Sequence, residues 1–468
     1  MKQDVLRKPE AVQQAGKGYT YFVAFVAAIG GFLFGYDTAI IAPAQLFLQK
    51  YFHLSSEQLG FAVSVLLLGC IAGPTLGARL CDWLGRKSVL FLSGVLFILG
   101  AIGTAVPHSI VVFDVFRFVG GLGIGFASLA SPMYIAEISP ARIRGRLGLM
   151  FQLAVTVGAL SATIVAYLIA SHYPEGSPAQ IEWAWRWMFA SIVIPIIIFL
   201  VLLVRVPQSP RWLAGRGKDD EALAILTKID GPEQAEKAMA EIKESLKEES
   251  GTFMELFQPG IRLALITGVL LALFNNWTGW SGVAYYLPSI FQMAGIPDPS
   301  KAIGVALVPM AANVLLTLVA IWLVDRVGRR PVWIATAAAM IVSPTLMGLA
   351  FHLHLAPAFI VMTTLLILIP HAVGLGPLPW LMMSEIFPTR IRARAVSITT
   401  TFLWFAGFTG PLAFPKLVET SQRTVGSPGG IFWMYAVICI FALIFGIKLL
   451  PETKARTLED IGKSWERR

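Results

Sequence analysis

The sequence has few charged residues for its length. Lys, Arg, Asp and Glu make up 14% of its 468 residues, against roughly 25% in an average soluble protein. Apolar residues make up 56% of the chain, and 30 Phe and 13 Trp are among the aromatic residues. A water-soluble globule of this size cannot bury so much apolar surface, so we expect lipid to solvate the chain. Disordered and coiled-coil proteins are excluded.

Cysteine is also scarce. The three cysteines, Cys70, Cys81 and Cys439, lie in or beside apolar runs, and their odd number speaks against a disulfide framework. Neither they nor the six histidines have the spacing of a metal site. A glycine run at 120–125 resembles a dinucleotide-binding loop, but no strand precedes it, and small residues at this spacing let helices approach closely. We therefore expect no enzyme, no cofactor and no metal.

Twelve apolar runs are long enough to cross a membrane, since a spanning helix needs about 20 residues. They lie at 21–44, 60–80, 88–106, 111–134, 146–170, 186–204, 261–291, 301–324, 331–353, 356–386, 393–418 and 430–450. A polar stretch, 206–260, separates the first six from the last six, and its mixed charges predict short amphipathic helices. The expected fold is an all-α membrane protein with a six-helix bundle at 1–205, a cytoplasmic linker at 206–260, and a second bundle with a short tail at 261–468.

The distribution of Lys and Arg tests this topology. With both termini in the cytoplasm, 31 of the 37 basic residues fall on the inner side and four in outer loops. This asymmetry is the one expected for a multi-pass protein. It also accounts for the net charge of +9, through topology and attraction to membrane lipid rather than through nucleic-acid binding.

Two motifs occur once in each half of the chain. The segment 136–146 (AEISPARIRGR) recurs 248 positions later as 384–394 (SEIFPTRIRAR). The segment 82–87 (DWLGRK) recurs 243 positions later as 325–330 (DRVGRR). Paired halves of this kind are how many secondary transporters are built, with the substrate site at the midplane between them.

The repeated Asp-x-x-Gly-Arg-Lys/Arg loops resemble the signature of the major facilitator superfamily. An ordered set of further motifs is similar to its sugar porter family: 31–37 (GFLFGYD), 117–125 (RFVGGLGIG), 207–211 (PQSPR), 376–380 (GPLPW) and 451–454 (PETK). The resemblance covers the chain from about residue 31 to residue 461.

Asp37 lies in the middle of the first run. An acid in hydrocarbon costs about 2.5–3.5 kcal/mol on insertion scales, so it should face a cavity or a partner. One reading is a structural ion pair with Arg117 of the fourth span. The reading we favour is a proton carrier whose affinity changes when Arg117 moves, and the resemblance implies this role because proton-driven members carry Asp at this position. Asp114, one turn before Arg117, is expected to be a solvated residue at the outer rim.

Acidic and basic residues collect in the inner loops. The expected groups are Asp82 with Arg86, Glu137 with Arg144 and Arg146, Asp325 with Arg329, and Glu385 with Arg392 and Arg394. The resemblance implies that these groups, with Glu452, form a cytoplasmic latch between the halves in the outward-open state. Trp83 stands where the first copy usually has a basic residue.

The resemblance also implies a substrate site and an outer gate. The positions that match sugar contacts are Gln152, Asn275, Asn276, Trp280, Ser281, Asn313 and Trp380, and the outer-gate pair is Tyr285 and Tyr286. Amides suit adjacent hydroxyls, and an aromatic face suits the C–H side of a pyranose. The alternative for any single Asn or Gln is an interhelical hydrogen bond.

A motif in the seventh expected span, 261–291, departs from the family pattern. The usual Gln-Gln-x-x-Gly-Ile-Asn is here Asn-Asn-Trp-Thr-Gly-Trp-Ser at 275–281. Leu403 likewise replaces the usual Asn before Trp404. A deoxy sugar, a pentose, a polyol or a non-sugar solute therefore stay open as substrates. His371, in the middle of its span, contacts either the substrate or a neighbouring helix.

Together these features predict a secondary transporter that carries a sugar or related polyhydroxy solute into the cell with a proton. The alternatives are a passive facilitator, a symporter of a non-sugar solute, and a transporter-like nutrient sensor, although only 17 residues follow Pro451. We expect a monomer in the inner membrane of a bacterium. Its partners are a small sugar-like molecule, protons and lipid.

Overall fold

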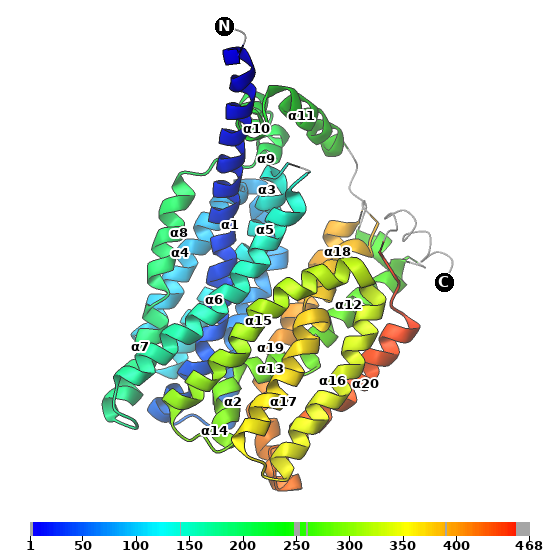
Figure 1. The fold of residues 1–468 in the computed structure, drawn as a ribbon. Coiled ribbons are helices and arrows are strands. Elements are labelled where there is room, and N and C mark those ends of the chain that lie inside the picture. Colours follow the sequence, from blue (N-terminus) through cyan, green and yellow to red (C-terminus); the bar gives the residue numbers. More distant parts are fainter. Residues whose placement is uncertain (1–2, 141, 248–252, 259–260, 389–390, 455–468) are drawn as a thin grey trace.

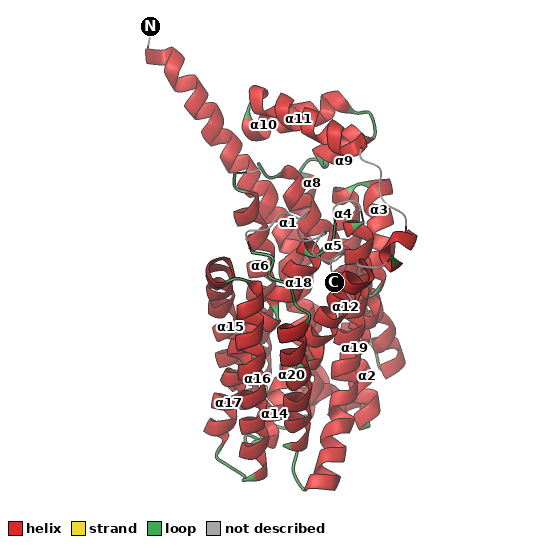
Figure 2. Cartoon of the chain, turned by 90° about the vertical axis from the view of Figure 1, so that its right-hand side faces the viewer, coloured by secondary structure: helices red, strands yellow, loops and turns green. Residues whose placement is uncertain are grey.

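A computed structural model of the chain describes residues 3–140, 142–247, 253–258, 261–388 and 391–454. All the regular elements within these ranges are helices. Figure 1 shows two groups of long helices side by side, one formed by the first half of the chain and one by the second. Figure 2 shows three short helices, α9, α10 and α11, beyond one end of the long ones.

The first bundle contains α1 to α8. Its elements are α1 (Gln3–Phe52), α2 (Ser56–Cys70), the π-helix η1 (Gly73–Gly77), α3 (Ala78–Leu84), α4 (Arg86–Ala105), α5 (Ile110–Ile138), α6 (Arg144–His172), α7 (Pro178–Ala190) and α8 (Val193–Val204). The helix α1 projects beyond the bundle at its N-terminal end (Figure 1). Near this end, Lys228 from the polar stretch between the bundles lies over the Tyr19 ring of α1, with its Nζ atom 3.9 Å from the centre of the ring.

The polar stretch folds into helices, as the charge pattern predicts. They are α9 (Pro210–Gly215), α10 (Asp219–Asp230), α11 (Pro232–Lys247) and the 3-10 helix η2 (Phe253–Phe257). Leu213, Leu226 and Met239 bury their side chains together in a small separate core. Ser209 caps α9, because its side chain accepts from the Trp212 backbone N–H.

The second bundle contains α12 to α20. Its elements are α12 (Ile261–Trp277), α13 (Trp280–Tyr285), α14 (Leu287–Met293), α15 (Pro299–Val327), α16 (Arg329–His352), α17 (Pro357–Pro370), the π-helix η3 (His371–Leu375), α18 (Pro377–Glu385), α19 (Arg392–Val425) and α20 (Gly430–Lys448). The break between α12 and α13 depends on Gly279, which has φ +113° and whose missing side chain leaves room for the Tyr435 ring.

Eleven helical segments in the described part of the chain are long and apolar enough to cross a membrane. The expected twelfth span corresponds to α19, which has the length but whose apolar residues are diluted by Thr, Gly and Pro. It packs along α2 of the first bundle and α12 of its own. The twelve-helix, two-bundle membrane fold predicted from the sequence is therefore the fold of this protein.

Glycines bring α5 and α2 into backbone contact. A Cβ atom at Gly121 would lie 2.0 Å from the Leu66 carbonyl oxygen, and one at Gly125 would lie 2.8 Å from the Cys70 carbonyl oxygen. No side chain fits at these distances. The glycine run at 120–125 is thus a close helix contact, as expected, and it holds the middle of α5 against α2.

We predict that Gly121→Ala destabilises the protein, because the new methyl group meets backbone rather than a movable side chain. Overpacking of this kind costs about 1–3 kcal/mol. The control is Gly148→Ala on α6, where a Cβ atom meets nothing within 4 Å and alanine favours the helix. Thermal unfolding of the purified variants in detergent should show a lower midpoint for Gly121→Ala alone. A midpoint at or above that of the unmodified protein would contradict the packing argument.

Candidate functional site

Asp37 and Arg117 form an ion pair in the interior of the first bundle. The Arg117 Nη1 atom lies 2.6 Å from Asp37 Oδ1, and the two Nη atoms also point at the Asp37 carbonyl oxygen at 3.4 and 3.5 Å. The two residues are 8% and 1% exposed, respectively. The pair therefore joins α1 to α5 inside the first bundle, where both side chains are largely buried. Its role in proton coupling stays a prediction.

Two neighbours shape this pair. The Phe189 ring of α7 lies under the Arg117 guanidinium, 5.2 Å from its carbon, in a cation–π arrangement. On the other side, Gly120 leaves space for the carboxylate, because a Cβ atom there would lie 3.3 Å from Asp37 Oδ2. The Phe189 ring thus packs against the guanidinium, and the missing side chain at Gly120 leaves room for the carboxylate.

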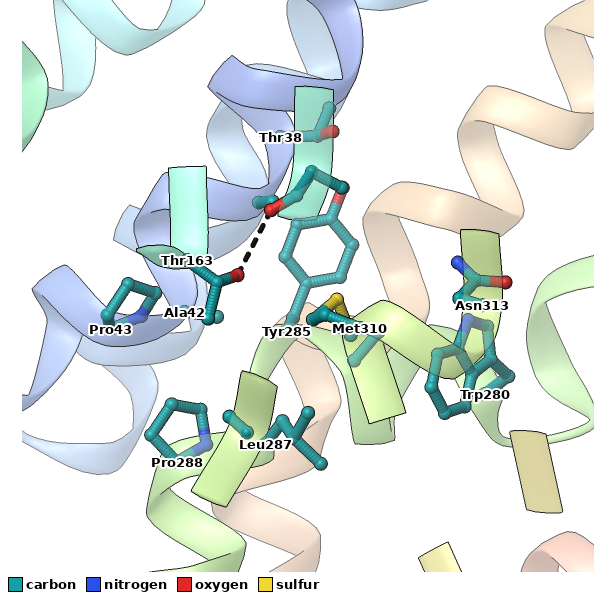
Figure 3. A pocket seen from close by; sticks show the side chains of 14 residues that line it. Thr38, Ala42, Pro43, Thr163, Trp280, Tyr285, Leu287, Pro288, Met310 and Asn313 are labelled. Carbon is teal, nitrogen blue, oxygen red and sulfur yellow. Dashed lines mark hydrogen bonds between the residues drawn. The ribbon is translucent and has the colours of Figure 1, made fainter. Parts of the chain in front are cut away.

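A cavity of about 150 Å³ opens between the two bundles, and Thr38, the residue that follows Asp37, is part of its wall (Figure 3). The first bundle lines it with α1 and α6, and the second with α13, α14 and α15. Its polar wall is formed by Thr38, Thr163, Tyr285 and Asn313. Trp280 and apolar side chains, among them Ala42, Pro43, Met310 and Leu287, form the rest. A cavity with a few hydroxyl and amide groups, an indole face and an apolar remainder suits a small polar organic molecule.

Asn313, Trp280 and Tyr285 are the site residues predicted from the sequence that line this cavity. Asn275 and Asn276 use their amide nitrogens elsewhere. Asn275 Nδ2 donates to the carbonyl oxygens of Leu375 and Gly376, both at 2.9 Å. Asn276 Nδ2 donates to the carbonyl oxygen of Leu403 at 3.1 Å and to Asn275 Oδ1 at 3.3 Å. In this conformation the two amides connect α12 to the junction between η3 and α18, and to α19.

The remaining predicted contacts lie around the cavity rather than on its wall. Gln152 is exposed on α6, and Ser281 is buried in α13. The Trp380 ring lies edge-on to Trp404 at 6.2 Å, and Trp404 in turn packs on Phe34 of the first bundle at 5.6 Å. This chain of rings links the two bundles.

The two tyrosines predicted as an outer gate, Tyr285 and Tyr286, point in different directions. Tyr285 lines the cavity. Tyr286 points away from it, stacks on Phe414 at 4.6 Å and donates from its hydroxyl to the Pro411 carbonyl oxygen at 3.0 Å. Neighbouring residues in a short helix project in different directions. Tyr286 therefore anchors the junction of α13 and α14 to α19, while Tyr285 faces the cavity.

At the end opposite α9 to α11, which the sequence predicts to be the outer side, contacts between the bundles close the cavity. Gln45 of α1 is 1% exposed and donates from Nε2 to the Tyr285 carbonyl oxygen at 2.7 Å. Lys416 of α19 pairs with Glu57 of α2 at 3.0 Å. A Cβ atom at Gly60 would lie 2.2 Å from the Leu412 carbonyl oxygen. Gln45 is not among the site residues predicted from the sequence, although a glutamine directly after the first apolar run was a signal for it.

At the end of the bundles nearest α9 to α11, which the sequence predicts to be cytoplasmic, each bundle has the same cluster. In the first, Arg86 pairs with Glu137 at 2.9 Å and with Asp82 at 3.6 Å, and Glu137 also accepts from the Ser209 hydroxyl. In the second, Arg329 pairs with Glu385 at 2.9 Å, and Glu385 accepts from the Thr453 hydroxyl at 2.6 Å. The acid of one repeated motif thus meets the arginine of the other.

These contacts correct part of the expected pairing. Glu137 contacts Arg86 instead of Arg144 or Arg146, because the end of α5 directs it back toward the loop before α4. Arg144 Nε lies 3.4 Å from the Ser139 carbonyl oxygen, and Arg146 is exposed. In the second bundle Arg392 donates to the Phe387 carbonyl oxygen at 3.3 Å, and Arg394 is partly buried in the first turn of α19. The side chain of Asp325 lies outside the described residues.

Glu452 caps the start of α16. Its two carboxylate oxygens accept from the backbone N–H groups of Arg329 and Arg330, both at 3.1 Å, and one also accepts from that of Lys454 at 2.8 Å. Burial alone would raise the pKa of Glu452, but these backbone hydrogen bonds lower it below its ordinary value. A carboxylate at a helix N-terminus also interacts favourably with the helix dipole.

We predict that Glu452→Gln lowers the thermal midpoint at neutral pH and that this difference shrinks in acid. Because the pKa of Glu452 is lowered by folding, its contribution is complete above the unfolded pKa of about 4.3 and is lost as the pH falls through the folded value. Thermal midpoints measured from pH 7 to pH 3.5 test this, with the exposed Glu175→Gln as control. An equal difference at every pH would contradict the capping role of the charge.

The chain resembles known transporters over nearly its whole length. A family model described as "Sugar (and other) transporter" matches residues 23–465. The arabinose-proton symporter of Bacillus subtilis is 36% identical over 454 residues, which cover 96% of this chain and 95% of the relative. The D-xylose-proton symporter of Escherichia coli is 35% identical over 482 residues, with 97% of each chain covered.

Solved structures agree with this. The inward-open xylose transporter XylE from E. coli has a TM-score of 0.84 at 34% identity, covering 96% of this chain and 100% of that one. The major facilitator superfamily proton:xylose symporter XylE bound to 6-bromo-6-deoxy-D-glucose has a TM-score of 0.78 at 34% identity, covering 96% and 99%. These proteins are transporters and not enzymes. The chain therefore belongs to the sugar transporter family, within the major facilitator superfamily.

Proposed function

We propose that this protein imports a sugar or a related small polyhydroxy solute together with a proton, by alternating access. The observation that carries the proposal is the buried Asp37–Arg117 pair, whose acid directly precedes Thr38 on the wall of the cavity between the bundles. The proton-coupled sugar symport of the similar proteins from B. subtilis and E. coli supports it.

The pair provides a way to couple the two fluxes. Charged Asp37 holds Arg117, and a proton on the carboxylate removes the charge that α1 presents to α5. Because the site is out of water, this change in attraction is much larger than it would be at the surface. Asp37 is adjacent to Thr38 on the cavity wall, so a change at the carboxylate reaches the α1 wall of the substrate site. One charge moved across 100 mV supplies about 2.3 kcal/mol, enough for tens-fold accumulation.

The cavity favours a substrate with few hydroxyls. Asn275 and Asn276 are committed to interhelical bonds, so the polar wall consists of Asn313 and three hydroxyl side chains. The Trp280 ring offers an apolar face for C–H groups. We infer a pentose-sized sugar as the preferred substrate class, which agrees with the arabinose and xylose specificity of the two relatives.

The conformation supports an inward-facing state. The outer contacts at Gln45 and Lys416 join the bundles, whereas the cytoplasmic ion pairs of Arg86 and Arg329 each join residues of one bundle. The TM-score to inward-open XylE, 0.84, exceeds the value of 0.78 to the sugar-bound form. We propose that the predicted cytoplasmic latch forms only when the inner side closes. We also propose that the protein is a monomer in a bacterial inner membrane, with both termini in the cytoplasm.

Asp37→Asn tests the coupling. The variant keeps the shape of the side chain but has no titratable group, so we expect it to lose pH-driven accumulation of D-xylose or L-arabinose in proteoliposomes and to retain counterflow. The exposed Asp220→Asn on α10 is the control and should accumulate normally. If Asp37→Asn still concentrates the sugar, protonation of Asp37 does not drive accumulation and the proposed coupling is wrong. If purified protein moves no sugar in either assay, the transporter assignment fails.

The outer ion pair gives a test of alternating access. Glu57→Lys places two cations together at the outer contact and replaces the attraction between the bundles there by repulsion. In a Thr38→Cys background we expect an impermeant thiol reagent to label the cavity from outside about two- to fivefold faster. The three native cysteines are buried and serve as the background.

The charge swap Glu57→Lys with Lys416→Glu restores the attraction and should return the labelling rate to its original value. Equal labelling in all three proteins would show that the outer contact does not govern access to the cavity.

A further inference from the structure

Two polar atoms beside the ion pair are buried and have no hydrogen-bond partner among the described residues. One is the Nε atom of Arg117, and the other is the Oδ1 atom of Asp114. One is a donor on a cation and the other is an acceptor on a carboxyl group. The sequence analysis expected Asp114 to be solvated at the rim, but the structure buries this oxygen within the bundle.

Asp114 and Arg117 are positioned so that their side chains can interact. Both belong to α5, three positions apart, and side chains at this spacing lie on the same face of a helix about 5–6 Å apart at Cβ. The Arg117 guanidinium reaches Asp37 through its Nη atoms only, so its Nε side stays open. Phe113, adjacent to Asp114, packs against Trp185 and Phe189 of α7 at 6.1 and 5.4 Å. Phe189 also underlies the guanidinium.

The transport cycle proposed above creates a need for such a group. When Asp37 takes a proton, its charge disappears, but Arg117 stays charged because a guanidinium does not lose its proton in proteins. A buried cation without an acceptor is strongly unfavourable. A second carboxylate on the same helix removes this obstacle without moving α1 and α5 apart.

We propose that Asp114 is a second acceptor for Arg117 and that the guanidinium turns from Asp37 to Asp114 when Asp37 is protonated. Asp114 is then a positioning residue, because it acts on proton binding through Arg117 and touches neither the proton site nor the substrate. The inference rests on the proposed proton coupling.

The surroundings leave few competing charges. The other titratable side chains within electrostatic range of the pair are Cys70 of α2 and Tyr285 of α13. Arg186 of α7 is engaged by the carbonyl oxygens of Ala105 and Pro107 and by Tyr51 and His108. Among these groups Asp114 is the acid besides Asp37 that lies within range of Arg117.

The direction of the effect follows from competition for one cation. A charged Asp114 draws Arg117 away from Asp37 and adds a second negative charge near it, and both effects favour a proton on Asp37. Asp114→Asn removes the competitor, so Arg117 stays with Asp37. Proton binding then needs a lower external pH.

The experiment measures uptake of D-xylose or L-arabinose by proteoliposomes over a range of external pH, together with counterflow. For Asp114→Asn we expect the half-maximal pH of driven uptake to move toward acid by about one unit, with counterflow retained. Asp114→Glu should keep the original profile. The control is Asp298→Asn, which removes another buried carboxyl on the outer side, where Asp298 caps α15.

The outcomes separate this inference from the proposed function. If the unmodified protein is proton-coupled and Asp114→Asn has the same half-maximal pH, Asp114 is not a partner of Arg117. If Asp114→Asn and Asp298→Asn lower the yield or thermal midpoint equally without a shift in pH, Asp114 is merely structural. If Asp37→Asn keeps accumulation, the proposed coupling fails before Asp114 is considered.

Discussion

A single ion pair out of water constrains most of this structure. Arg117 and Asp37 are nearly inaccessible to solvent, and removing one partner of a buried pair typically costs about 3–5 kcal/mol because the other charge is left uncompensated. The two helices that carry them must therefore stay in register at mid-span. Gly120 makes room for the carboxylate, and Gly121 and Gly125 seat α5 on α2 so that the guanidinium is presented toward α1. Thr38 follows Asp37 on α1 and is part of the cavity wall, so the helix that carries the acid also lines the cavity.

The duplication explains why the two halves look alike at the end where the repeated charged motifs lie and differ within the spans. Arg86 with Glu137 and Ser209, and Arg329 with Glu385 and Thr453, are the same cluster built twice. The ion pair has no such copy, since the offsets of 243 and 248 residues lead from Asp37 to Trp280 and from Arg117 to Leu365. The first half thus carries the proposed proton site, while the second supplies much of the wall of the cavity. With this division, a group in the first bundle can bind and release a proton while both bundles move about a shared substrate site.

Several contacts of the site show the limit of reading residues by position. Tyr285 and Tyr286 are adjacent and chemically identical, yet one lines the cavity and the other stacks on Phe414. Asn275 and Asn276 match sugar contacts in the resemblance, but here their amide nitrogens bond to main-chain carbonyl groups. A sequence pattern identifies which polar groups lie within a span. It does not say which partner each one takes, because that depends on helix rotation and on breaks such as the one at Gly279.

The amino-acid pattern was enough to predict the class of protein, the number and order of spans, and the presence of an acid and an arginine within them. These follow from hydrophobic length, charge asymmetry and duplication, which are local or additive properties of the chain. The three-dimensional arrangement was needed to find that Glu137 meets Arg86 and that Gln45 joins the two bundles. It also shows that Asp114 and Arg117 each keep an atom without a partner among the described residues. These depend on distances between residues far apart in the chain. In a low-dielectric interior, such distances determine which charges and dipoles satisfy one another.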